Sequence, residues 1–261
     1  MKKPKSFAIR ADYPKNVSTM LTFGGIFVLI FIWSLISIFF PSPNIPSPLA
    51  VIKSLPQLHF EDALVRNAGY SIKLNVLGYL EAVMVSLILG FGIGLFPLAK
   101  GMFNKPIDSL RYVPLTACTG LFIAWFGIQD GMKIHFLAFG IVVYLLPLVV
   151  QRISEVPLVY EQTVRTLGAG KWQTIRLVFI PQSLAKLSDD IRVVVAISWT
   201  YIIVAELVNK TGGLGAMAYA SARQSRIDKM FAILLIIVLI GFAQDKLLKM
   251  LDKVLFPHKY A

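Results

Sequence analysis

The chain has 261 residues, of which 56% are hydrophobic and 15% charged, and its formal net charge is +12. A soluble domain is usually less apolar and more charged, and several apolar runs here are long enough to cross a bilayer. The composition therefore excludes a soluble domain and predicts an all-helical protein with about six membrane spans. The Lys and Arg residues gather beside these runs, which favours a membrane boundary over nucleic acid as the reason for the positive charge.

Residues 1–19 form a basic, polar segment, which we expect to be a cytoplasmic tail. The apolar run 20–40 is too long for a signal peptide, and a Pro-Ser-Pro sequence follows it instead of a cleavage site. We therefore predict a retained first span. A short interfacial helix should follow it, because Leu49, Ile52 and Leu55 recur at helical spacing.

Five further spans are expected in a single permease-sized domain, residues 20–257, with a short tail at 258–261. They are predicted at 72–99, 107–126, 133–150, 191–207 and 230–248. If the N-terminus is cytoplasmic, the inner segments hold seventeen Lys and Arg and the outer segments eight. This bias predicts that both termini and the loop 151–187 are cytoplasmic, as in a protein of the bacterial inner membrane.

The loop between the fourth and fifth spans has a helical pattern of its own. A helix is predicted from Leu158 to Leu167, a break at 168–170, and a second amphipathic piece at 171–180 that ends at Pro181. Its apolar side chains recur at roughly helical spacing: Val164, Leu167, Trp172, Ile175 and Phe179. On physical grounds alone an ordinary loop is the simpler interpretation, and an element inserted into a partner is the alternative.

Motifs for catalysis and for metal or nucleotide binding are not found. The sequence Gly168-Ala169-Gly170-Lys171 fails as a phosphate-binding loop, because Arg165 and Trp172 stand where Gly and Ser or Thr are required. The three His are far apart in sequence and form no helical metal pair, and Cys118 is the single Cys. We therefore expect no enzyme activity, metal or cofactor on this chain.

Ionisable groups within spans are better candidates for function, because a charge inside the bilayer is costly unless it is paired or faces water. Glu81 lies in the second span, and we favour pairing with another span over contact with substrate. The candidates for the pathway or its gate are Glu81, Thr116, Thr119, Gly120, Ser198, Tyr201 and Glu206. Hydrogen bonding between helices is the alternative for Thr116, Thr119, Ser198 and Tyr201, and exposure at the membrane interface is the alternative for Glu206.

The loop resembles the cytoplasmic EAA loop of ABC-importer permeases, most closely in the nitrate, sulfonate, taurine and bicarbonate group. That group typically has A-R-x-x-G-A-S, and this chain has V-R-T-L-G-A-G at 164–170. The acidic residue of the family falls on Gln162, and the nearest acid is Glu161. Gly168 matches the family's Gly, and Ile180-Pro181 its Leu-Pro-like pair.

Further phrases of the same group occur in the same order along the chain. They are S-P-x-x-V at 47–51, R-x-x-P at 111–114, W-F-G at 125–127, Arg192, A-E at 205–206 and G-L-G at 213–215. Two departures stand out: Gly120 replaces a second Pro of the third span, and Asp190 replaces a Gly before Arg192.

The resemblance implies the transmembrane subunit of an importer that works by alternating access. It implies a second permease copy, an ATP-binding subunit that holds ATP and Mg, and a solute-binding protein that delivers a small anion such as nitrate, a sulfonate or bicarbonate. The implied ATPase-coupling residues are Glu161, Gln162, Val164, Arg165, Leu167, Gly168, Ala169, Lys171 and Trp172. The alternative is a stand-alone secondary transporter or channel, which would work without an ATPase.

Overall fold

The computed structural model describes residues 13–208 and 211–260, and every regular element in this part of the chain is helical. The elements are α1 (Lys15–Phe39), α2 (Pro48–Phe60), α3 (Leu64–Leu95), α4 (Pro97–Leu110), η1 (Leu115–Cys118), α5 (Thr119–Phe126), α6 (Asp130–Ser154), α7 (Leu158–Thr166), α8 (Lys171–Thr174), η2 (Ile175–Phe179), α9 (Ile180–Val193), α10 (Val195–Val208), α11 (Leu214–Arg223), α12 (Ile227–Leu255) and η3 (Pro257–Lys259).

Helix α6 is the centre of the bundle. In its most apolar stretch 67% of the residues are buried, against 28% in α3 and 11% in α12. Helix α3 packs directly along α6, because Gly78 and Gly90 leave room for it. A Cβ at Gly90 would lie 2.4 Å from Val149, and one at Gly78 would lie 2.8 Å from Leu137. Small residues therefore set the close approach of these two helices.

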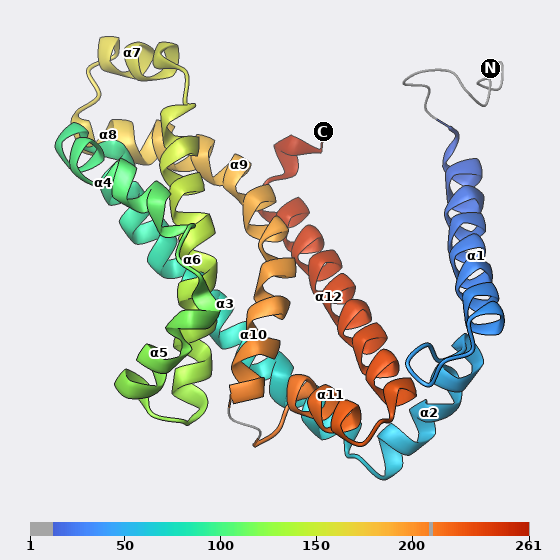
Figure 1. Cartoon of the computed structure of the whole chain (residues 1–261). Helices are drawn as coiled ribbons and strands as arrows, with labels where there is room; N and C mark the ends of the chain where they lie inside the picture. Colours follow the sequence, from blue (N-terminus) through green and yellow to red (C-terminus); the bar gives the residue numbers. More distant parts are fainter. Residues whose placement is uncertain (1–12, 209–210, 261) are drawn as a thin grey trace.

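Helix α1 stands apart from this bundle (Figure 1), and none of its residues is buried. It is held near its C-terminal end by Trp33, which donates a hydrogen bond to the carbonyl of Pro46 at 3.0 Å and stacks on Phe231. The predicted interfacial helix is present as α2, which buries Val51, Ser54 and Leu58 and leaves Leu49 and Ile52 exposed. The tail prediction falls partly outside the described residues, but residues 15–19 are already helical.

Four helices are long and apolar enough to cross a membrane, namely α1, α3, α6 and α12, and the bent pair formed by α8–α9 and α10 can supply a fifth. The span predicted at 107–126 is not one helix but is broken into two pieces. Helix α4 ends at Leu110, and the chain restarts as η1 at Leu115 after Pro114. Proline supplies no N–H and disfavours a helical residue before it, so Pro114 separates the two pieces.

Prolines are also involved in two other differences in helix bounds. Helix α3 ends at Leu95, because Phe96 is extended (φ −106°, ψ 116°) before Pro97, which opens α4. The prediction that Pro181 ends the second loop helix is wrong. The segment η2 is a π-helix in which the N–H of Ile180 bonds to the carbonyl of Ile175, and the helix continues through Pro181 into α9. The wider turn accommodates the proline.

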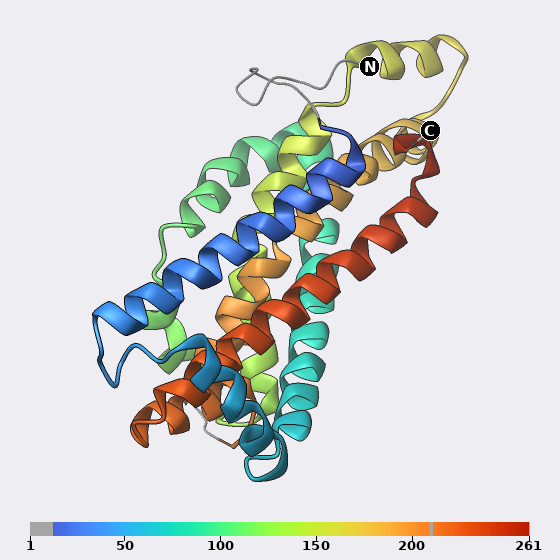
Figure 2. The same ribbon diagram turned by 90° about the vertical axis from the view of Figure 1, so that its right-hand side faces the viewer.

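The helices place two sets of short elements at opposite ends of the molecule. Helices α7 and α8 and the C-terminal segment lie at one end, and α2, α5 and α11 lie at the other (Figures 1 and 2). We call these the α7 end and the α11 end. The beginning of α1 lies on the same side as the α7 end.

Candidate functional site

The loop at the α7 end is a short helix, a tight glycine turn and a second helix. The N–H of Gly168 bonds to the carbonyl of Arg165, and that of Ala169 bonds to the carbonyl of Val164, both at 2.9 Å. This pair of bonds is the Schellman arrangement, which requires a left-handed residue, and Gly168 has φ +87°. Gly170 then opens α8, where its N–H is capped by the side chain of Gln173 at 2.8 Å.

Two large apolar side chains are left open to solvent around this turn. Leu167 is 81% exposed and Trp172 is 78% exposed. Helix α7 projects away from the other helices (Figure 1) and has no buried residue. An exposed apolar pair on a projecting, well-capped element is typical of a protein-docking surface.

The polar residues of the loop are arranged beside this pair. Glu161 and Arg165 form an ion pair at 2.7 Å on one face of α7, and Gln162 and Lys171 are exposed. A cavity of about 380 Å³ lies beneath the helix, between Arg165, Lys171 and the α3–α4 junction at Phe96. Glu161, the acidic residue nearest to Gln162, is thus paired with Arg165 of the same helix.

A buried polar cluster occupies the α11 end, centred on Glu206. Its carboxylate is fully buried and accepts hydrogen bonds from the hydroxyl of Ser71 at 2.6 Å and the N–H of Gly215 at 2.7 Å. The loop before α11 is bonded to the same site, since the N–H of Leu214 donates to Ser71 at 2.8 Å. Gly213 packs so close that a Cβ there would lie 2.2 Å from the Glu206 carboxyl group. The two sequence phrases at 205–206 and 213–215 therefore form one unit.

Lys133 extends this cluster into α6 and was missed as a functional candidate in the sequence. It is fully buried, and its ammonium donates to Tyr70 at 3.2 Å and to Thr211 at 3.3 Å. Tyr70 in turn donates to Asp130. The signal that could have found it is a lone Lys at the start of a span, because such a charge needs partners.

Glu81 pairs with another helix, as expected. Its carboxylate oxygens lie 2.8 and 3.1 Å from Nδ1 of His135 on α6, and the His135 ring lies 4.5 Å from the ring of Phe126. Both partners are partly exposed. His135 was missed because the sequence offers no neighbouring ligand for it.

The remaining pathway candidates do not share one surface. Thr116 and Gly120 are exposed on η1 and α5, and the hydroxyl of Thr119 bonds to the carbonyl of Thr116 at 2.6 Å. Ser198 is fully buried and bonds to Asn75 of α3 at 3.0 Å. Tyr201 is half-buried and packs edge-to-face on Phe136. Ser198 thus serves helix packing in this conformation, and the open surface belongs to η1 and α5.

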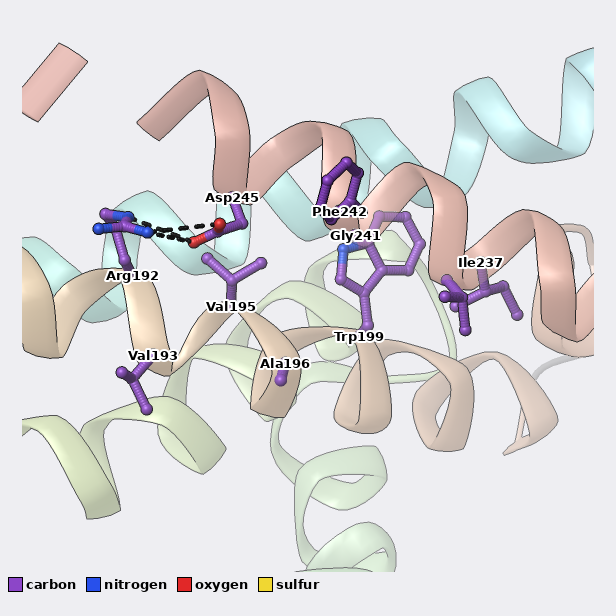
Figure 3. A pocket seen from close by; sticks show the side chains of 10 residues that line it. Arg192, Val193, Val195, Ala196, Trp199, Ile237, Gly241, Phe242 and Asp245 are labelled. Atoms are coloured by element: carbon purple, nitrogen blue, oxygen red, sulfur yellow. Dashed lines mark hydrogen bonds and ion pairs between the residues drawn. The ribbon is translucent and has the colours of Figure 1, made fainter. Parts of the chain in front are cut away.

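A groove of about 450 Å³ separates α10 from α12 (Figure 3). Trp199 reaches across it toward Gly241, and its indole N–H donates to Gln244 at 2.8 Å. The ion pair of Arg192 and Asp245 lies at one end of the groove, with 3.1 Å between Nη2 and Oδ1. The other walls are apolar, so the groove offers little to a small anion. Within the described residues no three His, Cys, Asp or Glu side chains come together as a metal site.

The projecting loop, the broken spans and the buried polar cluster at the α11 end are those of a membrane permease. The family model for the binding-protein-dependent transport system inner membrane component matches residues 26–256. The chain belongs to this family, and it is a permease subunit of a binding-protein-dependent ABC importer in the inner membrane.

Characterised relatives cover nearly the whole chain. The taurine transport system permease protein TauC of Escherichia coli is 26% identical over 98% of this chain and 95% of its own length. The nitrate import permease protein NrtB of Synechococcus elongatus is 23% identical over 88% of this chain and 87% of its own length.

Solved structures share the fold. The MetNI methionine ABC transporter in an inward-facing conformation has a TM-score of 0.63 at 17% identity, covering 77% of this chain and 98% of the other. An amino acid ABC transporter has a TM-score of 0.58 at 19% identity, covering 78% of this chain and 97% of the other.

Proposed function

We propose that α7 and α8 form the surface on which an ATP-binding subunit docks. The observation that carries this proposal is the exposed pair of Leu167 and Trp172 around the left-handed turn at Gly168. Hot spots of protein interfaces are enriched in Trp and Arg and are surrounded by a polar rim, so Trp172 is the expected anchor and Leu167 adds apolar contact beside it. Here Arg165 and Lys171 would supply that rim. ATP and Mg would be bound by the partner and not by this chain.

The docked subunit would drive alternating access. The transporter would contain two copies of the permease, each with a single transmembrane domain at residues 20–257. Helices α8, η2 and α9 follow one another without a loop and lead directly into α10. A displacement of the docking surface is therefore passed along the chain to the α11 end, where the Glu206 cluster holds α3, α10 and α11 together. A solute-binding protein would deliver its cargo at that end, and lipid would surround the exposed apolar faces.

We propose that the substrate is a small anion. Support comes from the names of relatives, which are a taurine and a nitrate permease. Nitrate is a compact anion, and taurine carries a compact anionic sulfonate beside its ammonium group. The α7 end, with the beginning of α1 and the C-terminal segment, would be cytoplasmic, which is the orientation that the bias of Lys and Arg predicts.

A pull-down from detergent tests the docking surface. The tagged chain is compared with the variants Leu167→Asp and Gly168→Asp, and co-purified protein is assayed for ATP hydrolysis. We expect an ATPase with the wild type and none with either variant, because the first places a charge in an apolar contact and the second cannot adopt φ +87° without strain. The solute-binding protein encoded or recovered with it is then tested for thermal stabilisation by taurine, nitrate and bicarbonate.

Val254→Asp is the matched control, because Val254 is 78% exposed at the same end of the molecule but lies on α12. It should recover as much ATPase as the wild type. If Leu167→Asp also binds as much ATPase as the wild type, α7 is not the docking surface. Stabilisation of the binding protein by an uncharged or cationic solute alone would exclude the small-anion assignment.

A further inference from the structure

Helix α9 connects the docking surface to the core of the bundle. The segment Lys171–Val193 meets α10 at a bend of 43°. Val194 lies at the bend and is buried, with φ −73° and ψ −3°. Along the chain, a displacement of α8 reaches α10 through this bend. The contacts that hold the last turn of α9 therefore decide whether the displacement rotates α10 or is lost by sliding.

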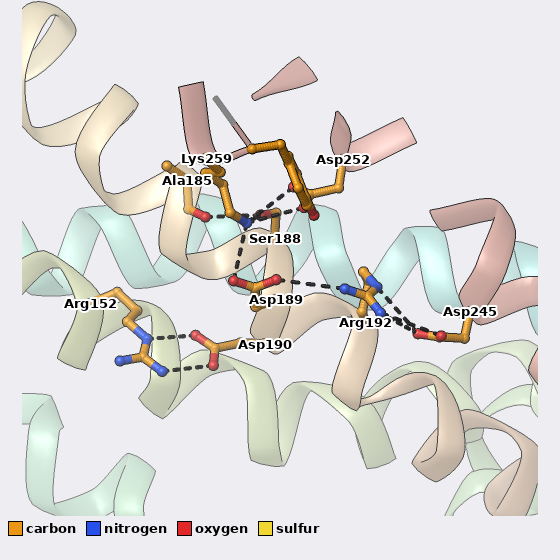
Figure 4. A network of polar contacts seen from close by, with 10 residues as sticks. Arg152, Ala185, Ser188, Asp189, Asp190, Arg192, Asp245, Asp252 and Lys259 are labelled. Atoms are coloured by element: carbon orange, nitrogen blue, oxygen red, sulfur yellow. Dashed lines mark hydrogen bonds and ion pairs between the residues drawn. The ribbon is translucent and has the colours of Figure 1, made fainter. Parts of the chain in front are cut away.

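One face of that turn is clamped to α6. Arg152 donates from Nε to Oδ2 of Asp190 at 2.7 Å and from Nη2 to Oδ1 at 2.8 Å (Figure 4). Two parallel bonds of this kind fix both distance and orientation. Arg152 is also held from its own side, because Nη1 donates to Glu155 at 2.9 Å. The side chains of Arg152 and Asp190 are 27% and 12% exposed, so the pair is largely shielded from solvent.

The opposite face is tied to α12 and to the C-terminal segment. Arg192 pairs with Asp245 of α12 at 3.1 Å, and the neighbouring Asp189 pairs with Lys259 at 3.1 Å. Lys259 also pairs with Asp252 at 3.1 Å (Figure 4). Residues 189, 190 and 192 occupy a single turn, yet their charges reach two different helices and the C-terminal segment.

We propose that the Arg152–Asp190 ion pair is a positioning clamp for transport, which makes α9 pivot at α6 instead of sliding past it. The proposal rests on the proposed docking of an ATPase at α7. Arg152 and Asp190 touch neither substrate nor nucleotide in this account; they act through the orientation of α9. The ion pairs on the α12 side are more exposed, since the side chain of Asp245 is 40% exposed and that of Asp189 is 56% exposed. Exposed ion pairs contribute little, so the Arg152–Asp190 pair on the α6 side supplies the stiffer contact.

The clamp predicts a separation between movement at the docking surface and movement at the α11 end. Spin labels are placed on cysteines at the exposed positions Gln162, Leu207 and Met84 in a Cys118→Ser background. Met84 on α3 is the fixed reference, and labelled chains are diluted with unlabelled copies. Distances 84–162 and 84–207 are measured in the complex with its ATPase, without nucleotide and with ATP, Mg and vanadate.

In the otherwise unchanged chain both distances should respond to nucleotide. In Asp190→Asn the 84–162 change should remain and the 84–207 change should be lost. The double variant R152Q/D190N should behave in the same way, and it leaves no unpaired buried charge that could prevent folding. Asp108→Asn is the control, because it removes an exposed ion pair within α4 and should keep both changes.

The clamp is overturned if the 84–207 change survives in Asp190→Asn and in the double variant. A different result would contradict the docking proposal. If no ATPase is recovered, or if the 84–162 distance of the unchanged chain ignores nucleotide, α7 is not a coupling surface and the clamp has no role to play.

Discussion

The two ends of this permease differ in what they bury and what they leave exposed. At the α11 end every group of the Glu206 cluster has a partner within the chain, and the carboxylate is fully buried. At the α7 end the backbone of the turn is fully capped, but Leu167 and Trp172 remain exposed. The polar groups of the first region are satisfied within one chain, whereas the second leaves an apolar surface open, as the proposed docking of another protein requires.

This difference separates stability from coupling. A change at the α11 end should act on the fold of the isolated subunit, because buried polar groups are costly when their partners are lost. A change at the exposed pair should leave the isolated subunit intact and act only on assembly. The same measurement made on both ends therefore tests whether the two regions have distinct roles.

The largest effect is expected at Gly213. Gly213→Ala should lower the free energy of unfolding by about 3 kcal/mol, because the residue has φ +101° and its Cβ would lie 2.2 Å from the carboxyl group of Glu206. The measurement is the thermal unfolding midpoint of the purified chain in detergent. Gly92→Ala is the control, since Gly92 is helical with open space around it and should tolerate alanine. Equal midpoints for the two variants would mean that the Glu206 cluster does not hold the α11 end.

Sequence patterns predict much of this fold, because an apolar run of sufficient length has few alternatives to a membrane helix. Helices α6 and α12 and the helix–turn–helix at 158–174 follow from periodicity and from the glycines. The break at Pro114 and the passage through Pro181 do not, since the effect of a proline depends on whether the neighbouring turn can widen or must end.

The polar clusters are harder to predict than the helices. Glu206 meets Ser71, which is 135 residues earlier in the chain, and Lys133 meets Tyr70 at a separation of 63. Such pairs have no local signature and become visible only when α3, α6 and α10 are packed together. Arg165 and Trp172, by contrast, lie within one loop, so spacing predicts the two short helices that carry them, although only the family resemblance points to a docking role.

Trp172→Ala should separate assembly from stability. The affinity for the ATPase should fall by about 2 kcal/mol, or roughly thirtyfold, because the substitution removes a large apolar anchor from the interface. The unfolding midpoint of the isolated chain should stay within experimental error of the wild type, since Trp172 is 78% exposed. Binding is measured by titrating the purified ATPase onto immobilised permease. A lower midpoint together with unchanged binding would assign Trp172 to folding and weaken the contrast between the two ends.

The smallest effect is expected from Glu155, which supports Arg152 at the exposed edge of the α7 end. A hydrogen bond from Arg152, and to a smaller extent one from Gln151, holds the pKa of Glu155 below its usual range. The charged form is thus favoured in the folded state, so this stabilisation is present above the unfolded pKa of about 4.3 and is lost as the pH falls through the folded pKa. The unfolding midpoint of Glu155→Gln should lie slightly below that of the wild type at neutral pH, and the gap should close on acidification. A gap that widens toward acid would show that the Glu155 carboxylate is not stabilised by Arg152, and the support for the clamp on the α6 side would have to come from Asp190 alone.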